Sequence, residues 1–200
     1  RLDVTFLGPW LVAFFGMILA AWPLSAYPAL STRFVFFYLT CILCVIVVVS
    51  TVRTGRHLLR LLSFTSLSLL VISLYGVVQR IQGVEVNPSY VDMDLNEGMP
   101  GRVYGFFENP NAFAEVLLLL IPVAIAYMLC AKSWGGRFLG LLSAGVGCVA
   151  IAMTYSRASW VGLAFAAVIF VLLWNRKLIP LGIFAALVIL AALPDTVFNR

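Results

Sequence analysis

Apolar residues in this chain form long uninterrupted blocks that are separated by short polar links. A membrane-spanning helix needs about 20 mostly apolar residues. Seven blocks approach that length, at about 6–24, 34–51, 61–78, 110–131, 138–155, 160–174 and 178–193. This pattern predicts an all-α, polytopic transmembrane helix bundle with about seven spans.

The composition favours the same class of protein. Hydrophobic residues make up 63% of the 200 positions and charged residues 10%, with a mean hydropathy of +1.07. A soluble domain has about 25% charged residues, so too little polar material is present to cover a globular surface. We predict a single transmembrane domain over 1–200. Because the chain starts at Arg1 rather than Met, we expect a piece of a longer protein, in which 195–200 opens a further external loop.

The net charge of +5 raises nucleic acid as a partner, but the basic residues lie in short links and form no patch of the kind that such binding needs. Cytoplasmic loops retain Lys and Arg. Three alternate links hold seven of the thirteen basic residues and no acid: Arg53, Arg56, Arg60, Lys132, Arg137, Arg176 and Lys177. We therefore predict a cytoplasmic N-terminus and an external loop at 79–111.

Cysteine and histidine give weak signals for metal or redox chemistry. Cys41 and Cys44 have C-x-x-C spacing, yet no His or second Cys pair lies nearby in the sequence. We predict neither a metal nor a cofactor, and we interpret His57 as an interfacial loop residue on the cytoplasmic side. Gly136 and Gly140 have G-x-x-x-G spacing, which we interpret as packing within the chain rather than as a dimer face.

Two polar motifs flank the starts of predicted spans, at 101–111 (GRVYGFFENPN) and at 154–160 (TYSRASW). Asn109 followed by Pro110 is typical of an N-cap with proline at the first helical position, although Asn111 is an alternative cap. Ser156 or Ser159 can cap the next such helix. Both helices start on the predicted external side, where helix N-termini favour anions.

Each of these helix starts has an arginine beside it, Arg102 or Arg157. Guanidinium binds phosphate with bidentate geometry and stays charged in a low-dielectric setting. The two motifs therefore suggest a pyrophosphate cradle on one membrane face. The alternative is that both arginines reach the lipid headgroups or pair with acids such as Glu108 and Glu115.

The arrangement of Arg102, Gly105 and 109–111 (NPN), followed by 156–163 (SRASWVGL), resembles the O-antigen ligase and polymerase superfamily. That superfamily includes bacterial protein O-oligosaccharyltransferases. The resemblance implies a glycosyltransferase of polysaccharide biosynthesis in the cell envelope. Its members transfer a glycan from undecaprenyl pyrophosphate to a glycan or lipid acceptor at the outer face of the bacterial cytoplasmic (inner) membrane.

The resemblance also implies that Arg102 and Arg157 bind the pyrophosphate of the lipid-linked oligosaccharide donor. We add Asn109, Asn111 and Ser156 to this predicted substrate-binding set. The catalytic base is expected in an external loop beyond residue 195, with Glu108 and Glu115 as candidates within the chain. Two alternatives stay open, a small-anion (bicarbonate-like) transporter and a non-catalytic membrane scaffold.

Overall fold

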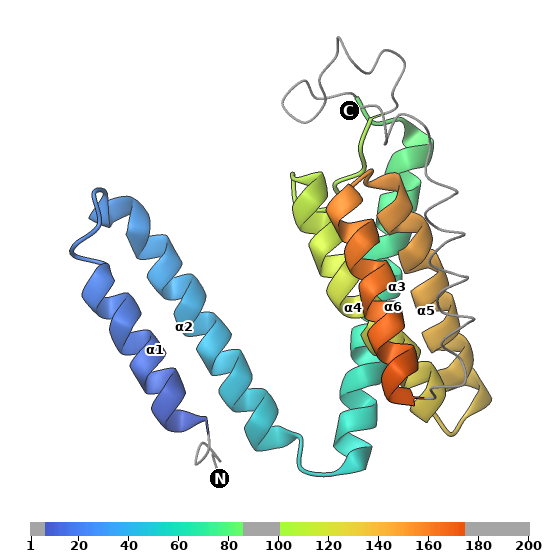
Figure 1. The fold of residues 1–200 in the computed structure, drawn as a ribbon, viewed down its shortest axis with the longest axis horizontal. Helices are drawn as coiled ribbons and strands as arrows, with labels where there is room; N and C mark the ends of the chain where they lie inside the picture. Colours follow the sequence, from blue (N-terminus) through green and yellow to red (C-terminus); the bar gives the residue numbers. More distant parts are fainter. Residues whose placement is uncertain (1–6, 86–100, 175–200) are drawn as a thin grey trace. The chain divides into compact units, whose positions relative to one another are not determined.

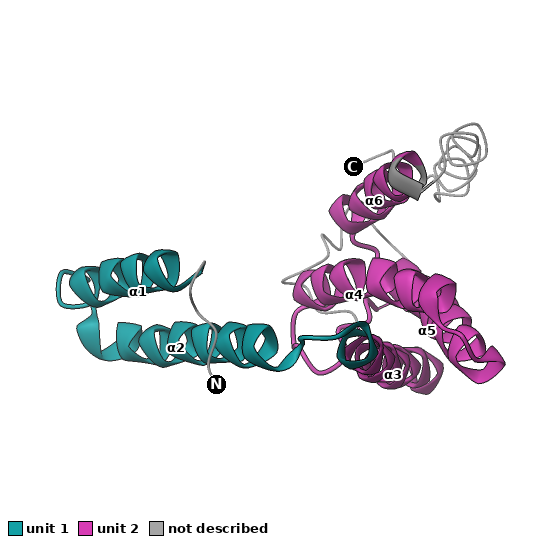
Figure 2. Cartoon of the chain, turned by 90° about the horizontal axis from the view of Figure 1, so that it is seen from below, with its two compact units in different colours: residues 1–58 teal, residues 59–200 magenta. Residues whose placement is uncertain are grey.

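The computed structural model describes residues 7–85 and 101–174, and these residues are all-helical, with no β-strand among them (Figure 1). The chain divides into two compact units, residues 1–58 and residues 59–200 (Figure 2). The predicted span at 178–193 and the segment at 195–200 lie outside the described residues. The all-α prediction holds for the described part.

The first unit contains a hairpin of two helices, α1 (Gly8–Ala21) and α2 (Pro28–Thr51). Both begin with a proline in the first two positions, where its missing N–H costs no hydrogen bond. The helices contact each other through apolar side chains, and Phe14 packs edge-to-face on Tyr38 at 5.8 Å between ring centroids. Neither helix buries a residue completely, so the hairpin leaves much of its apolar surface exposed.

The second unit packs four helices around one core: α3 (Gly55–Gln82, from Leu59 onward), α4 (Pro110–Cys130), α5 (Trp134–Met153) and α6 (Arg157–Trp174). The α4 helix contacts both α5 and α6. Its buried residues Phe113, Leu117 and Ile121 form the centre of the core. Leu69 of α3 and Ile151 of α5 complete that centre, so the fold of this unit depends on α4.

The α5 helix approaches α4 closely because it presents glycine to it. A Cβ built on Gly140 would lie 2.7 Å from the backbone N of Met128 and 2.8 Å from the carbonyl O of Ala124. Gly136 is also buried, against Tyr127 and Ala131. The prediction that this G-x-x-x-G pair packs within the chain is confirmed.

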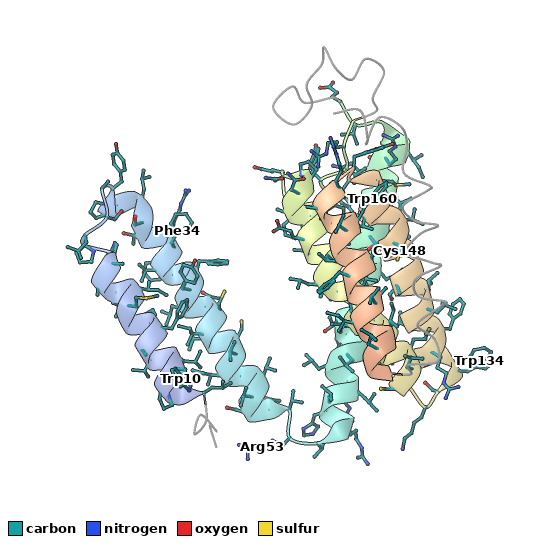
Figure 3. All side chains as sticks on the ribbon, viewed as in Figure 1. Trp10, Phe34, Arg53, Trp134, Cys148 and Trp160 are labelled. Atoms are coloured by element: carbon teal, nitrogen blue, oxygen red, sulfur yellow. The ribbon has the colours of Figure 1, made fainter. Side chains whose placement is uncertain are left out.

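Four of the helices, α2 to α5, are long and apolar enough to cross a membrane. The helices α1 and α6 are shorter apolar helices, so the structure does not support the predicted count of seven spans. Large apolar side chains point away from the core, including Phe64, Leu119 and Phe165. Trp160 and Trp134 lie at opposite ends of the second unit (Figure 3), as aromatic side chains do at the two membrane surfaces. These features indicate a membrane-embedded protein.

Helix boundaries differ from the hydropathy blocks, mainly because helices continue beyond the apolar stretch. The α3 helix begins at Gly55 and ends at Gln82, so it includes the basic residues Arg56 and Arg60 as well as the first residues of the predicted 79–111 loop. A helix can continue past the hydrocarbon as long as its polar side chains reach water. The α4 helix agrees with the predicted span, starting at Pro110.

Candidate functional site

The two sequence motifs meet at one end of the second unit. The loop at 101–109 joins the segment after α3 to α4, and the turn at 154–156 joins α5 to α6. The backbone N–H of Val103 donates to the carbonyl of Met153 at 3.2 Å, and Arg102 Nε donates to the carbonyl of Thr154 at 2.7 Å. The loop is therefore bonded directly to the turn, although 52 residues separate Arg102 from Thr154.

The last turn of α3 holds the same loop. Gln79 Oε1 accepts hydrogen bonds from the backbone N–H groups of Tyr104 (3.1 Å) and Gly105 (3.0 Å). Gly105 has a φ of 59°, and a Cβ there would lie 2.9 Å from the ring of Phe113. Glycine is thus required both by the backbone conformation and by the space. These contacts fix the loop that carries Arg102.

Asn109 is the N-cap of α4, as the sequence predicted. Its Oδ1 accepts from the backbone N–H groups of Asn111 at 2.8 Å and Ala112 at 3.4 Å, and Pro110 follows as the first helical residue. Asn111 is inside the helix, which excludes the alternative cap. Because its oxygen satisfies helix N–H groups, Asn109 orients α4, and its side chain is not part of the pocket described below.

The turn before α6 is buried and internally bonded. Ser156 precedes the helix, its carbonyl accepts from the N–H of Trp160, and its Oγ lies 3.0 Å from Ser159 Oγ. Tyr155 has a φ of 52°, a left-handed conformation that costs a non-glycine residue about 1–2 kcal/mol. The turn therefore places a strained tyrosine directly beside Ser156 and Arg157.

A pocket of about 430 Å³ opens where α4 and α6 begin. It is lined by residues of both motifs and of the two helices: Arg102, Asn111, Glu115, Leu118, Tyr155, Ser156, Arg157, Ala158 and Ser159. The structure thus brings together four of the five predicted substrate-binding residues, all except Asn109. Of the two carboxylate candidates, Glu115 lines the pocket and Glu108 does not.

The pocket arginines are held differently. Arg102 is half-buried, and its Nη2 donates to Asn111 Oδ1 at 2.6 Å, so its guanidinium has a fixed orientation. Arg157 is exposed, and among the described residues its guanidinium has no hydrogen-bond or ion-pair partner. Glu115, on the same face of α4 as Asn111, is also exposed and has no such partner within 7–85 and 101–174.

The pocket is suited to an anion. Two guanidinium groups and one carboxylate line it, and the N-termini of α4 and α6 add partial positive charge. In the described part of the chain, no three His, Cys, Asp or Glu side chains lie close enough to hold a metal ion. The arrangement can bind a phosphate or diphosphate group through its arginine donors, whereas the first N–H groups of α4 are already bonded to Asn109.

Sequence reasoning missed Gln79, Arg80 and Tyr155. Arg80 Nη1 donates to the carbonyl of Gly101 at 3.0 Å, and its Cζ lies 5.9 Å from the centroid of the Tyr155 ring. The only sequence signal for Tyr155 is its position next to the Ser156–Arg157 motif. Gln79 and Arg80 lie at the end of an apolar block, where polar residues are common.

Comparison with known proteins assigns no family to this chain. No family model, no curated protein and no solved structure matches it. The resemblance to the O-antigen ligases therefore stays a prediction, and a functional assignment depends on the residues that line the pocket.

Proposed function

We propose that this protein transfers a glycan from an undecaprenyl-pyrophosphate carrier to an acceptor hydroxyl at the outer face of a bacterial cytoplasmic membrane. The observation that supports the proposal is the pocket shared by Arg102 and Arg157, which come from separate motifs and lie beside the starts of α4 and α6. A diphosphate ester needs such a cluster of fixed donors, because charge develops on the leaving diphosphate.

In the proposed reaction the acceptor oxygen attacks the anomeric carbon of the sugar. The bond from that carbon to the diphosphate oxygen breaks, and the diphosphate leaves with the electron pair. Arg102 and Arg157 stabilise the negative charge that develops on the leaving group. The Glu115 carboxylate accepts the proton of the acceptor hydroxyl, since it faces the same pocket and has no cation bonded to it among the described residues.

Glu108 has no part in this scheme, because its side chain does not line the pocket. In the orientation that we propose, the pocket end of the second unit faces the outside, and the start of α3 with Arg56 and Arg60 faces the cytoplasm. The lipid part of the donor then lies in the membrane while its diphosphate reaches the helix N-termini.

Transport of a small anion is the second candidate. Transporters place ionisable residues and broken helices near the membrane midplane. Between 61–79, 116–131, 138–153 and 158–170 the chain has no Asp, Glu, Lys or Arg, and the arginine pocket lies at helix ends. These features favour a surface reaction over a path through the described helices.

The test replaces Arg157 and Arg102, each by Ala and by Lys, and measures glycan attachment in cells together with the amount of protein in the membrane. We expect each Ala variant to lose about 10²–10³-fold in activity, as for loss of one donor to a developing anion. Lys keeps the charge and loses the planar fork, so it should rescue only part of the activity.

The matched control is Arg60→Ala. Arg60 is an exposed arginine of the second unit that does not line the pocket, and its loss should leave glycan attachment unchanged. Wild-type attachment in all four pocket variants, at normal protein level, would exclude the proposal. A loss of solute uptake in those variants would favour transport instead.

A further inference from the structure

Arg80 contacts both segments that carry the pocket arginines. It lies in the last turn of α3, and its Nη1 donates to the carbonyl of Gly101, the residue before Arg102. Its guanidinium also lies over the ring of Tyr155, two residues before Arg157. Arg80 itself does not line the pocket. One side chain outside the pocket therefore contacts the backbone of the loop before Arg102 and the tyrosine ring of the turn before Arg157.

Tyr155 provides the second half of this contact. Its φ of 52° is the conformation in which a helix usually ends with glycine, so a tyrosine here is strained. The ring is half-buried, lines the pocket and lies under the guanidinium of Arg80. Strain of this kind is kept where the surrounding structure enforces it, and such positions concentrate at functional sites.

The position of Arg157 depends on this turn. Its guanidinium has no partner among the described residues, whereas Arg102 is bonded to Asn111 and to the carbonyl of Thr154. Thr154 Oγ1 and the N–H of Ser156 also bond within the turn. A shift of the turn relative to the loop at 101–105 would break the bonds that Arg102 and Val103 make to the turn, and it would move Arg157 away from Arg102.

We propose that Arg80 and Tyr155 are positioning residues, which form a clasp that sets the spacing of Arg102 and Arg157 for a ligand with two phosphate groups. This inference rests on the proposed function of the pocket. Its chemical consequence is selectivity: a diphosphate can engage both arginines at once only at the correct spacing, whereas a single phosphate can bind to either one.

The experiment measures the affinity of the purified full chain, in lipid nanodiscs, for inorganic pyrophosphate and for inorganic phosphate. The variants are Tyr155→Gly and Arg80→Met. For both we expect pyrophosphate affinity to fall about three- to tenfold, the range that loss of one cation–π contact gives. Phosphate affinity should change by less than about twofold, because a single arginine still suffices.

Tyr155→Gly separates positioning from folding. Glycine adopts a φ near 52° without strain, so this variant should unfold at the same or a higher temperature than the wild type while it loses pyrophosphate affinity. Tyr155→Phe keeps the ring and should recover most of that affinity. Arg33→Met is the matched control, because it removes an exposed arginine over the ring of Phe34 in the first unit.

The outcomes distinguish the clasp from the pocket itself. In one outcome the wild type binds pyrophosphate, and Arg157→Ala abolishes this binding. If Tyr155→Gly and Arg80→Met then bind both anions as the wild type does, the clasp is wrong, while the proposed role of the pocket is supported. An equal loss for phosphate and pyrophosphate would also contradict the clasp. If the wild type binds no pyrophosphate, the proposed function fails together with the clasp.

Discussion

Replacement of Gly140 by alanine tests the close approach of α5 to α4. The new Cβ would lie 2.7 Å from Met128 N and 2.8 Å from Ala124 O, and backbone atoms cannot rotate away as a side chain can. Extra methyl groups in a packed core cost about 1–3 kcal/mol. Alanine also favours the helix by up to about 1 kcal/mol over glycine. We therefore expect a net loss of about 1–2 kcal/mol in the free energy of unfolding.

Gly145 gives the matched control, since it lies in the same helix and a Cβ there has no atom within 4 Å. Gly145→Ala should raise the free energy of unfolding by about 0.5–1 kcal/mol through helix propensity alone. The purified protein is unfolded in mixed micelles by increasing amounts of sodium dodecyl sulfate. Tryptophan fluorescence reports the folded fraction, from which the free energy of unfolding is obtained. Equal stability of the two variants would refute the close packing of α4 on α5.

Substitutions at two further positions test the local structure that holds the site. Asn109→Ala removes the N-cap of α4 and should lower the free energy of unfolding by about 0.5–2 kcal/mol, whereas Asn109→Asp should restore it in the same micelle assay. An unchanged stability of the alanine variant would show that the cap is not formed. Gln79→Leu leaves the N–H groups of Tyr104 and Gly105 without their acceptor, so hydrogen exchange of both amides should accelerate, by an amount that corresponds to about 1–3 kcal/mol. If the two amides of Gln79→Leu exchange as slowly as in the wild type, Gln79 is not their hydrogen-bond acceptor.

Local signals in the sequence were sufficient to predict where α4 starts. An asparagine before proline at the edge of an apolar block specifies a cap by short-range chemistry, and the structure has this cap at Asn109. The pairing of Gly136 with Gly140 also depends on helix period alone. Alternation of the links across a membrane predicted that Arg102 and Arg157 lie at the same end, and both line one pocket.

Other features depended on contacts between distant segments and could not be predicted. Hydropathy does not register where a helix ends in water, so it gave no indication that α3 continues to Gln82 and brings Gln79 and Arg80 to the loop. Asn109 was predicted both to cap α4 and to bind the substrate, and the structure has the cap but does not place its side chain in the pocket. The choice between Glu108 and Glu115 needed the direction of α4, which only the packed unit defines.

The hydrogen bond from Arg102 to the carbonyl of Thr154 has a consequence for synthesis of the protein. The arginine is made 52 residues before its acceptor, and a ribosome adding about 5–20 residues per second needs roughly 3–10 s for that interval. During this time α4 and α5 are synthesised, while the loop at 101–105 lacks the partner that closes the pocket. A nascent chain that stalls within α5 therefore contains Arg102 but lacks the turn at 154–156 that completes the pocket.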